Sequence, residues 1–228
     1  LSPATLRRVV ARALTRQFAE AITDATAPYQ FALTTRAGTE ALSLALKFLT
    51  DADPDAVVLS IDGIGAFDHV RRDTILAKLD STPALRQLAP LVRQLYGRQS
   101  IFLWSDDDGS VHDIRQGEGG EQGDPLMPAL FALGLHGALV SARARLQDDE
   151  FLFAYLDDLY VVTTRDRARA AFDVVTTEVA NGAGVRTHLG KFRLWSRAGG
   201  PCPPGFETLG SEVWAGDAAP QDRGVKVL

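Results

Sequence analysis

The sequence predicts an α+β fold in which helices cover a sheet of antiparallel strands. Short apolar runs rich in β-branched and aromatic residues alternate with longer segments in which apolar residues recur every three or four positions. Two pairs of these short runs are separated by only a few acidic or glycine residues, as in β-hairpins. Hairpin strands pair antiparallel, and amphipathic helices bury their apolar faces against such a sheet.

The composition is that of an ordinary globular domain. The chain has 228 residues, of which 46% are hydrophobic and 23% charged, enough for one or two packed units. No apolar run approaches the roughly 20 residues of a membrane span, and the N-terminal residues have no signal-peptide pattern. Cys202 is the only cysteine, which excludes intrachain disulfides and thiolate zinc sites. We therefore expect an intracellular protein.

Helical periodicity dominates the N-terminal part. An amphipathic helix is predicted from an apolar residue at every fourth position, at Leu6, Val10, Leu14, Phe18 and Ile22. After a loop, Thr39 is predicted to cap a second helix that runs to about Leu49. Because the chain begins inside a helical segment without an initiator methionine, we expect it to be part of a longer polypeptide.

The next segments predict a buried strand, two helices and a hairpin. The strand spans 56–61, is rich in β-branched residues and ends directly before an acid, Asp62. Helical spacing returns in two segments, 71–79 and 83–96. The hairpin strands lie on either side of an Asp-Asp-Asp-Gly turn, at 99–104 and 110–114.

A second acidic turn is predicted further along the chain. Beyond a stretch rich in glycine and acids, Asp124 is expected to cap, and Pro125 to open, a long helix through about Leu146. Two apolar runs then flank Asp157 and Asp158, which places both acids at the turn of a hairpin. One helix and two short strands complete the layout, over 165–180, 192–195 and 206–209.

The acids Asp62, Asp157 and Asp158 predict a cation site. Neighbouring carboxylates between apolar strands lose hydration and repel one another, so a positive charge is expected between them. Carboxylate oxygens suit Mg²⁺ or Mn²⁺. If the strand before Asp62 pairs beside the hairpin, the three acids converge at one sheet edge and can hold two ions about 4 Å apart for phosphoryl transfer. A pair of acids in a solvated turn is the alternative.

Four segments in fixed order resemble the reverse transcriptases of non-LTR retrotransposons and group II introns. The segment 155–158 reads Tyr-Leu-Asp-Asp and resembles their Tyr-x-Asp-Asp motif, and 62–68 reads Asp-Gly-Ile-Gly-Ala-Phe-Asp, similar to Asp-x-x-x-Ala-Phe-Asp. The segment 119–128 resembles Gly-x-x-Gln-Gly-x-x-x-Ser-Pro, and 29–40 resembles the fingers segment before the first acid. The sequence departs from the family pattern at Met127 in place of Ser and at His188 in place of the Asn that precedes Lys191 by three residues.

The resemblance implies a right-hand polymerase palm with partial fingers and no thumb. Residues 1–55 would form part of the fingers, and 56–200 the palm, with 71–118 partly on the fingers side. Residues 201–228 would hold a primer-grip-like hairpin, which starts near Phe206, and the connection to a thumb.

The resemblance also implies roles for the acids and their neighbours. Asp62 and Asp157 would hold two Mg²⁺ or Mn²⁺ ions, with Asp158 a less direct ligand. Phe67 would exclude a 2′-hydroxyl and so favour deoxynucleotides, unless it is an ordinary core aromatic. Lys191 would give a proton to pyrophosphate, although a solvated lysine is the alternative.

Further residues would contact the nucleotide or the template. The amides of Gly65 and Ala66 would meet triphosphate oxygens. Gln122 and Gly123 would lie against the nucleotide and template, and the remaining candidates are Arg36, which is otherwise a solvated loop residue, and Tyr155. The four histidines share no ligand spacing and are expected to be surface or core residues, and Trp214 is a candidate for stacking on primer bases.

The expected partners are an RNA template, a DNA primer and dNTPs, within a larger polyprotein that also has thumb and endonuclease regions. The net charge of −5 opposes this expectation, because duplex binding recruits Lys and Arg. Two alternatives remain. One is the palm of a viral RNA-dependent RNA polymerase, which usually has Gly-Asp-Asp. The other is an inactive, domesticated module that retains the fold.

Overall fold

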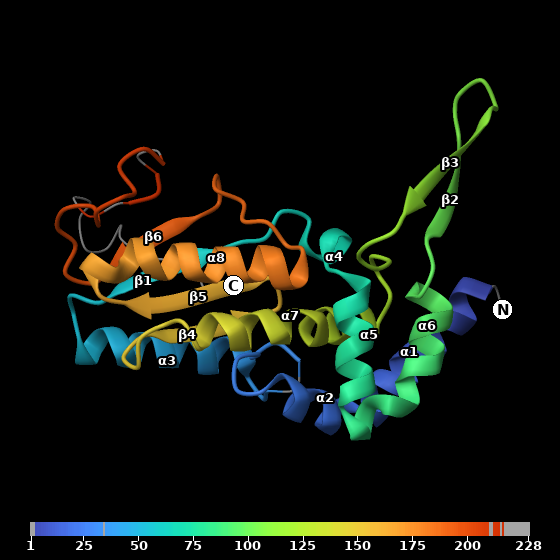
Figure 1. Cartoon of the computed structure of the whole chain (residues 1–228), viewed down its shortest axis with the longest axis horizontal. Coiled ribbons are helices and arrows are strands. Elements are labelled where there is room, and N and C mark those ends of the chain that lie inside the picture. Colours follow the sequence, from blue (N-terminus) through green and yellow to red (C-terminus); the bar gives the residue numbers. More distant parts are fainter. Residues whose placement is uncertain (1–2, 34, 210–211, 215, 217–228) are drawn as a thin grey trace.

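The computed structural model describes residues 3–33, 35–209, 212–214 and 216. A layered body of sheet and helices lies at one end of the molecule, and a group of helices with a projecting β-ribbon lies at the other (Figure 1). Within the described residues, no helix combines the length and the apolar character that crossing a membrane requires.

The body is built on a four-stranded sheet with strand order β4-β5-β1-β6. Every neighbouring pair is antiparallel, as the sequence predicts. The strands are β1 (Val57–Ile61), β4 (Phe151–Tyr155), β5 (Asp158–Thr163) and β6 (Arg193–Ser196). The partners of the strand β1 therefore lie about 100 residues (β5) and about 135 residues (β6) further along the chain.

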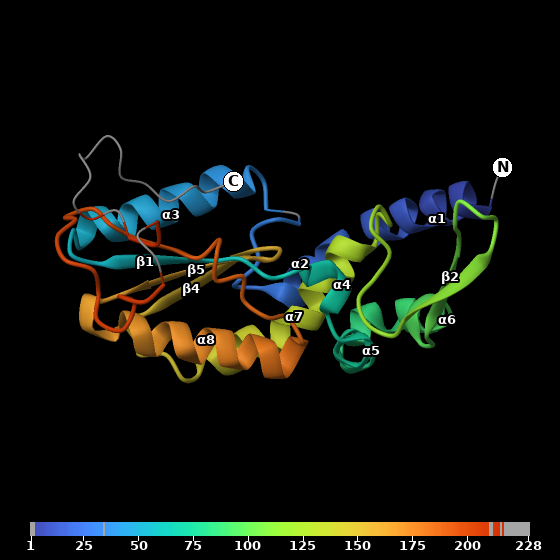
Figure 2. The same cartoon turned by 90° about the horizontal axis from the view of Figure 1, so that it is seen from above.

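Helices cover both faces of this sheet. α7 (Met127–Arg143) and α8 (Ala168–Ala183) lie on one face, and α3 (Gly38–Ala52) lies on the other (Figure 2). Alternate residues of β1 serve the two layers: Leu59 belongs to the larger apolar cluster with α7 and α8, whereas Val58 joins the smaller cluster with α3. Both side chains are completely buried, which explains the uninterrupted apolar run that predicted this strand.

The other end of the molecule contains the N-terminal helices and the chain between β1 and α7. Its helical elements are α1 (Pro3–Gln17), α2 (Ala19–Thr26), α4 (Ala66–His69), α5 (Arg72–Ser81), the 3₁₀ helix η1 (Pro83–Leu88) and α6 (Ala89–Tyr96). A second 3₁₀ turn, η2 (Arg165–Arg167), precedes α8. The helices predicted over 71–79 and 83–96 are thus present, with the second divided into η1 and α6.

The predicted hairpin is present as β2 (Ser100–Ser105) and β3 (Val111–Gln116), which form a separate two-stranded sheet in the part of the chain that the structure describes. The Asp106 carboxylate accepts the backbone N–H groups of Asp108 and Ser110, at 3.1 and 2.8 Å, and so fixes the turn. The ribbon projects away from the helices (Figure 1), and most of its residues are exposed on both faces.

Two predictions in the N-terminal part are wrong. The helix expected from Leu6 to Ile22 is divided between α1 and α2 at Phe18. Thr39 does not cap α3, because the helix already begins at Gly38 after Ala37, which has a left-handed φ of 52°. Thr39 lies within the first turn instead, where its hydroxyl donates to the Tyr155 hydroxyl at 3.4 Å.

Two predictions further along the chain are also wrong. Asp124 and Pro125 lie in the turn before α7, which begins at Met127. The Asp124 carboxylate still accepts the Leu126 N–H at 2.9 Å, as a capping side chain would, and it is also engaged by Arg7 and Tyr96 of other helices. Residues 206–209 form a turn rather than a strand, closed by a hydrogen bond from the Leu209 N–H to the Phe206 carbonyl at 3.1 Å. The buried Phe206 ring packs on Phe172 and Phe192, and the predicted hairpin beyond Leu209 lies largely outside the described residues.

Candidate active site

The end of β1 lies beside the turn between β4 and β5. Because β1 and β5 are antiparallel with Ile61 opposite Leu159, Asp62 is brought next to the turn that carries Asp157. Both acids line one small cavity beneath the sheet edge, together with apolar residues of α7 and α8. The convergence of these two distant acids, which the sequence pattern predicts, is present in the structure.

The two carboxylates affect one another. Burial raises the pKa of Asp157, and the negative charge of Asp62 raises it further. The Lys191 ammonium opposes this rise, since its Nζ lies 3.1 and 3.4 Å from the two carboxylate oxygens of Asp62. A cationic group therefore already lies at the acids, as their repulsion requires.

Asp158 has a different environment from Asp157. It is the first residue of β5 and pairs with Tyr155, so it lies on the sheet face shared with Tyr160. Burial raises the pKa of Tyr160 to about 12, with a further contribution from the charge of Asp158. In the part of the chain that the structure describes, no group of three or more His, Cys, Asp or Glu side chains has an arrangement that could hold a metal ion.

The turn that carries the acids is held from outside the hairpin. Leu156 has a positive φ of 54°, a conformation that costs energy for a residue with a side chain. Its backbone N–H donates to the Gln30 side-chain oxygen at 2.7 Å, while Gln30 itself forms a bridge with Ala154. Gln30 thus helps to fix this strained turn. The sequence placed it in a fingers-like segment without assigning it this role.

The segment after Asp62 forms a tight turn into α4. Gly65 has a φ of 50°, which glycine adopts without strain, and Ala66 is buried as the first residue of the short helix. The Phe67 ring is half-buried and stacks on Phe131 of α7, with 4.6 Å between ring centroids. Phe67 is therefore a core-contacting aromatic, and its partial exposure leaves part of the ring accessible.

The glycine-rich loop before α7 lies against this turn. The N–H of Gly120 donates to the Phe67 carbonyl at 3.0 Å, and the Gln122 side-chain amide donates to the Asp68 carboxylate at 3.2 Å. Gly119 approaches so closely that a Cβ there would lie 2.3 Å from the Asp68 carbonyl carbon. The structure thereby brings the segments 62–68 and 119–123 together, with Gln122 and Gly123 exposed.

Two remaining candidates lie near α3. Tyr155 is half-buried and packs against the smaller apolar cluster beneath that helix. Arg36 is exposed on the loop that leads into α3.

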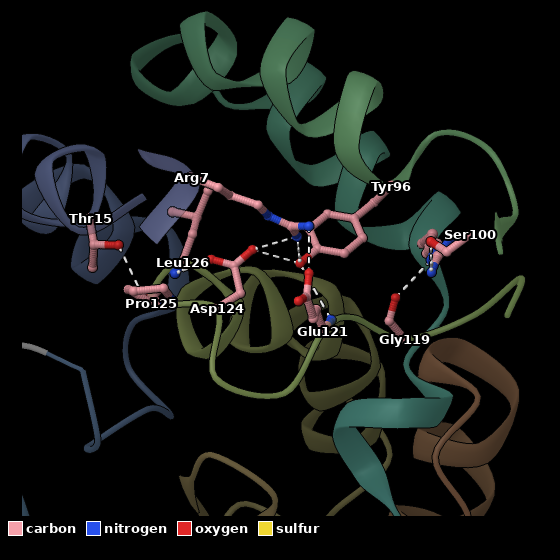
Figure 3. A network of polar contacts seen from close by, with 10 residues as sticks. Arg7, Thr15, Tyr96, Ser100, Gly119, Glu121, Asp124, Pro125 and Leu126 are labelled. Atoms are coloured by element: carbon pink, nitrogen blue, oxygen red, sulfur yellow. Dashed lines mark hydrogen bonds and ion pairs between the residues drawn. The ribbon is translucent and has the colours of Figure 1, made fainter. Parts of the chain in front are cut away.

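One group of polar residues in this region was not found by sequence reasoning (Figure 3). Arg7 of α1 and Tyr96 of α6 both contact Asp124, at 2.9 and 2.7 Å, and Asp124 directly follows Gln122 and Gly123. Arg7 resembles its neighbours Arg8 and Arg12 in the helical pattern, so only its half-buried position distinguishes it from them.

Comparison with known proteins identifies this arrangement. A family model described as reverse transcriptase (RNA-dependent DNA polymerase) matches residues 3–227. The chain belongs to the reverse transcriptase family. The resemblance seen in its motifs is thus confirmed, and the family domain is an RNA-directed DNA polymerase, which is a nucleotidyltransferase. No curated protein sequence matches the chain.

Solved structures with a similar fold include telomerases. Telomerase from Candida albicans, in complex with a fragment of telomeric RNA, superposes with a TM-score of 0.60 at 10% identity, over 88% of this chain and 35% of that chain. Apo telomerase from Candida tropicalis gives a TM-score of 0.59 at 11% identity, over 85% and 36%. This reverse transcriptase chain therefore spans about a third of their length, and the likeness confirms the predicted palm-like fold of an antiparallel sheet backed by helices.

Proposed function

We propose that this chain is the catalytic core of an RNA-directed DNA polymerase that adds dNTPs to a primer 3′-hydroxyl by a two-metal mechanism. The observation that carries the proposal is the meeting of Asp62 and Asp157 at one cavity, in a chain of the reverse transcriptase family. The partners that follow from it are an RNA template, a DNA primer and dNTPs.

The donor set fits two divalent ions of the Mg²⁺ or Mn²⁺ type. Asp62 and Asp157 supply oxygen ligands, and Mg²⁺ usually takes only one or two protein carboxylates, with water and phosphate oxygens completing its shell. Asp158 is the outer ligand of the set. When bound, such ions lower the pKa of the attacking hydroxyl and stabilise the leaving pyrophosphate.

Lys191 has two successive roles in this proposal. Before the ions bind, its ammonium offsets the charge of Asp62 at 3.1 Å. If Asp62 held an ion, the Lys191 ammonium would be free to turn toward the triphosphate and would donate a proton to the leaving pyrophosphate. A lysine on a flexible stem can move between two anionic partners in this way.

The nucleotide is held by the two segments that meet beside the acids. The backbone N–H groups of Gly65 and Ala66 bind triphosphate oxygens, because the turn at Gly65 points successive amides to one side. The exposed part of Phe67 lies against the sugar and excludes a 2′-hydroxyl. Gln122 and Gly123 lie against the base and the template, and Arg36 and Tyr155 complete the site.

The wider context is proposed on sequence pattern. The motifs Ala-Phe-Asp and Gln-Gly-Asp-Pro, and the spacing of roughly 60 residues from Asp62 to Gln122, favour a non-LTR retrotransposon. The polyprotein of such an element would also have thumb and endonuclease regions. In that context residues 1–55 form part of the fingers, 56–200 the palm, and 201–228 the primer grip and thumb connection.

Primer extension on an RNA template tests the proposal. We expect incorporation of dNTPs with Mg²⁺ or Mn²⁺ and none with EDTA, and Asp62→Asn should reduce extension to the EDTA level. Phe67→Val should admit rNTPs. Robust rNTP use by the unmutated protein would favour an RNA polymerase instead, and no extension with either nucleotide would favour an inactive module.

Metal binding has a readout that does not depend on activity. Mn²⁺ should raise the melting temperature of the unmutated protein by mass action, and Asp62→Asn should remove that rise. Asp107→Asn is the matched control, because Asp107 is an exposed acid at the tip of the β-ribbon. Equal loss of the Mn²⁺ effect in both variants would contradict a site at Asp62.

A further inference from the structure

The loop that carries Gln122 and Gly123 is held at both of its flanks by α1 and α6. Glu121 precedes the pair and forms an ion pair with Arg7 of α1, with 2.5 Å between Nη1 and Oε2. Asp124 follows the pair and accepts a hydrogen bond from Arg7 Nη2 at 2.9 Å. One guanidinium from the N-terminal helix therefore engages the residues on either side of the two exposed loop residues (Figure 3).

Asp124 is the centre of this arrangement. Its side chain is only 1% exposed, and each of its two carboxylate oxygens accepts at least one hydrogen bond. Oδ2 accepts from Arg7 and from the Tyr96 hydroxyl, at 2.9 and 2.7 Å, and Oδ1 accepts the Leu126 N–H at 2.9 Å. Burial together with the Asp124 carboxylate raises the pKa of Tyr96, so its hydroxyl stays protonated and available as a donor.

Tyr96 connects the two flanks. Its hydroxyl accepts hydrogen bonds from Arg7 at 2.8 Å and from the Glu121 N–H at 3.4 Å. Its ring lies 5.4 Å from the guanidinium carbons of both Arg7 and Arg72. Arg72 in turn donates to the Gly119 carbonyl at 2.7 Å, so the ring of Tyr96 also contacts the arginine that holds the glycine end of the loop.

The geometry points to a positioning role for these residues: we propose that Arg7, Tyr96 and Asp124 form an anchor that sets the position of Gln122 and Gly123 against the incoming nucleotide. The inference rests on the proposed function, in which those two residues contact the nucleotide and template. Because Gln122 and Gly123 are themselves exposed, their backbone position depends on the buried contacts of their neighbours. The N-terminal helix thus controls nucleotide affinity without touching the nucleotide.

Steady-state primer extension with Tyr96→Phe and Arg7→Met tests the anchor. Each variant should raise the KM for dNTP about ten-fold, the loss expected for hydrogen bonds to a charged group, and leave kcat within about three-fold. Arg7→Lys should recover part of the loss, since it keeps the charge but not the planar fork. Arg12→Met is the matched control, because Arg12 is an exposed arginine of the same helix, and it should leave KM unchanged.

Amide hydrogen exchange tests the anchor without measuring polymerase activity. In Tyr96→Phe and Arg7→Met, the amides of 119–124 should exchange faster than in the unmutated protein, whereas those of β1 and β5 should not change. Unchanged loop exchange in both variants, or an equal KM effect of Arg12→Met, would overturn the anchor. Faster exchange in a protein without polymerase activity would instead retain the anchor and reject the proposed function. If Arg7→Met does not fold, Tyr96→Phe, which loses only one hydroxyl, decides alone.

Discussion

The four-stranded sheet and the β2-β3 ribbon are both antiparallel and rich in apolar residues, yet they have opposite environments. In β1, Val57, Val58 and Leu59 are completely buried between α3 on one side and α7 and α8 on the other. In β2, Leu103 is 72% exposed and Trp104 is 54% exposed. The comparison teaches that an apolar run predicts a strand, whereas long-range packing decides whether that strand contributes to the core.

The two regions also differ in how far their strands reach along the chain. β1 pairs with β5, about 100 residues further along the chain, and with β6, about 135 residues further, so its burial requires the whole body to form. Among the described residues β2 pairs only with β3, across the five residues 106–110, and an isolated two-stranded ribbon is marginally stable in water. The sheet should therefore carry the global stability, and the ribbon should open on its own.

A matched pair of leucine truncations gives the largest expected difference. Leu59→Ala removes a fully buried side chain between two layers and should lower the free energy of unfolding by about 2–5 kcal/mol. Leu103→Ala removes an exposed side chain and should change the free energy of unfolding by less than about 0.5 kcal/mol. Urea unfolding followed by circular dichroism measures both. Similar losses in the two variants would mean that the ribbon is buried in solution.

Removing a buried acid of the body should lower the free energy of unfolding more than removing an exposed acid of the ribbon, with a smaller difference than for the two leucines. Next to β4, the Glu150 side chain is 1% exposed and accepts hydrogen bonds from Thr163 Oγ1 and the Gln147 N–H, both at 2.7 Å. Glu150→Ala leaves these donors unsatisfied and should cost about 2–4 kcal/mol. Asp106→Ala at the ribbon turn should leave the global free energy of unfolding unchanged. A large loss from Asp106→Ala in urea unfolding would contradict separate stability of the two regions.

The smallest of the expected effects is that low pH destabilises the β2-β3 ribbon. The Asp106 carboxylate is hydrogen-bonded to the His112 side chain and to the backbone N–H of Ser110. These hydrogen bonds lower the pKa of Asp106 below its usual value. A group whose pKa is lowered by folding stabilises the fold above its unfolded pKa, and that contribution is lost as pH falls through the lower folded value. The ribbon should therefore begin to open below about pH 4, the ordinary range of aspartate.

The indole N–H signal of Trp104 in an NMR titration measures this opening, because the Trp104 ring lies 5.2 Å from His112. In Asp106→Asn the same signal should not respond to pH in that range. A response that persists in Asp106→Asn would assign the opening to another group.

Much of the fold and part of the site follow from the sequence. Apolar runs predicted every strand of the sheet to within one residue or two, and the run is least interrupted in β1 and β5, whose residues are buried on both faces. The order of the acidic motifs identified the family, and hairpin spacing predicted the turn that carries Asp157, although Asp158 is already the first residue of β5. Some predictions failed where tertiary contacts decide a residue's role: Thr39 resembles a helix cap but donates to Tyr155, and Asp124 accepts the Leu126 N–H locally and Arg7 and Tyr96 from other helices as well.

The sequence by itself determined which segments form strands and helices, and which acids end or connect those strands, because these features depend on neighbours within a few positions. Only the tertiary structure decided that Lys191 lies on Asp62, that Gln30 holds Leu156 and that Arg7 engages Asp124. These contacts join residues separated by more than a hundred positions. Their partners are selected by how the layers pack, and no local pattern records that choice.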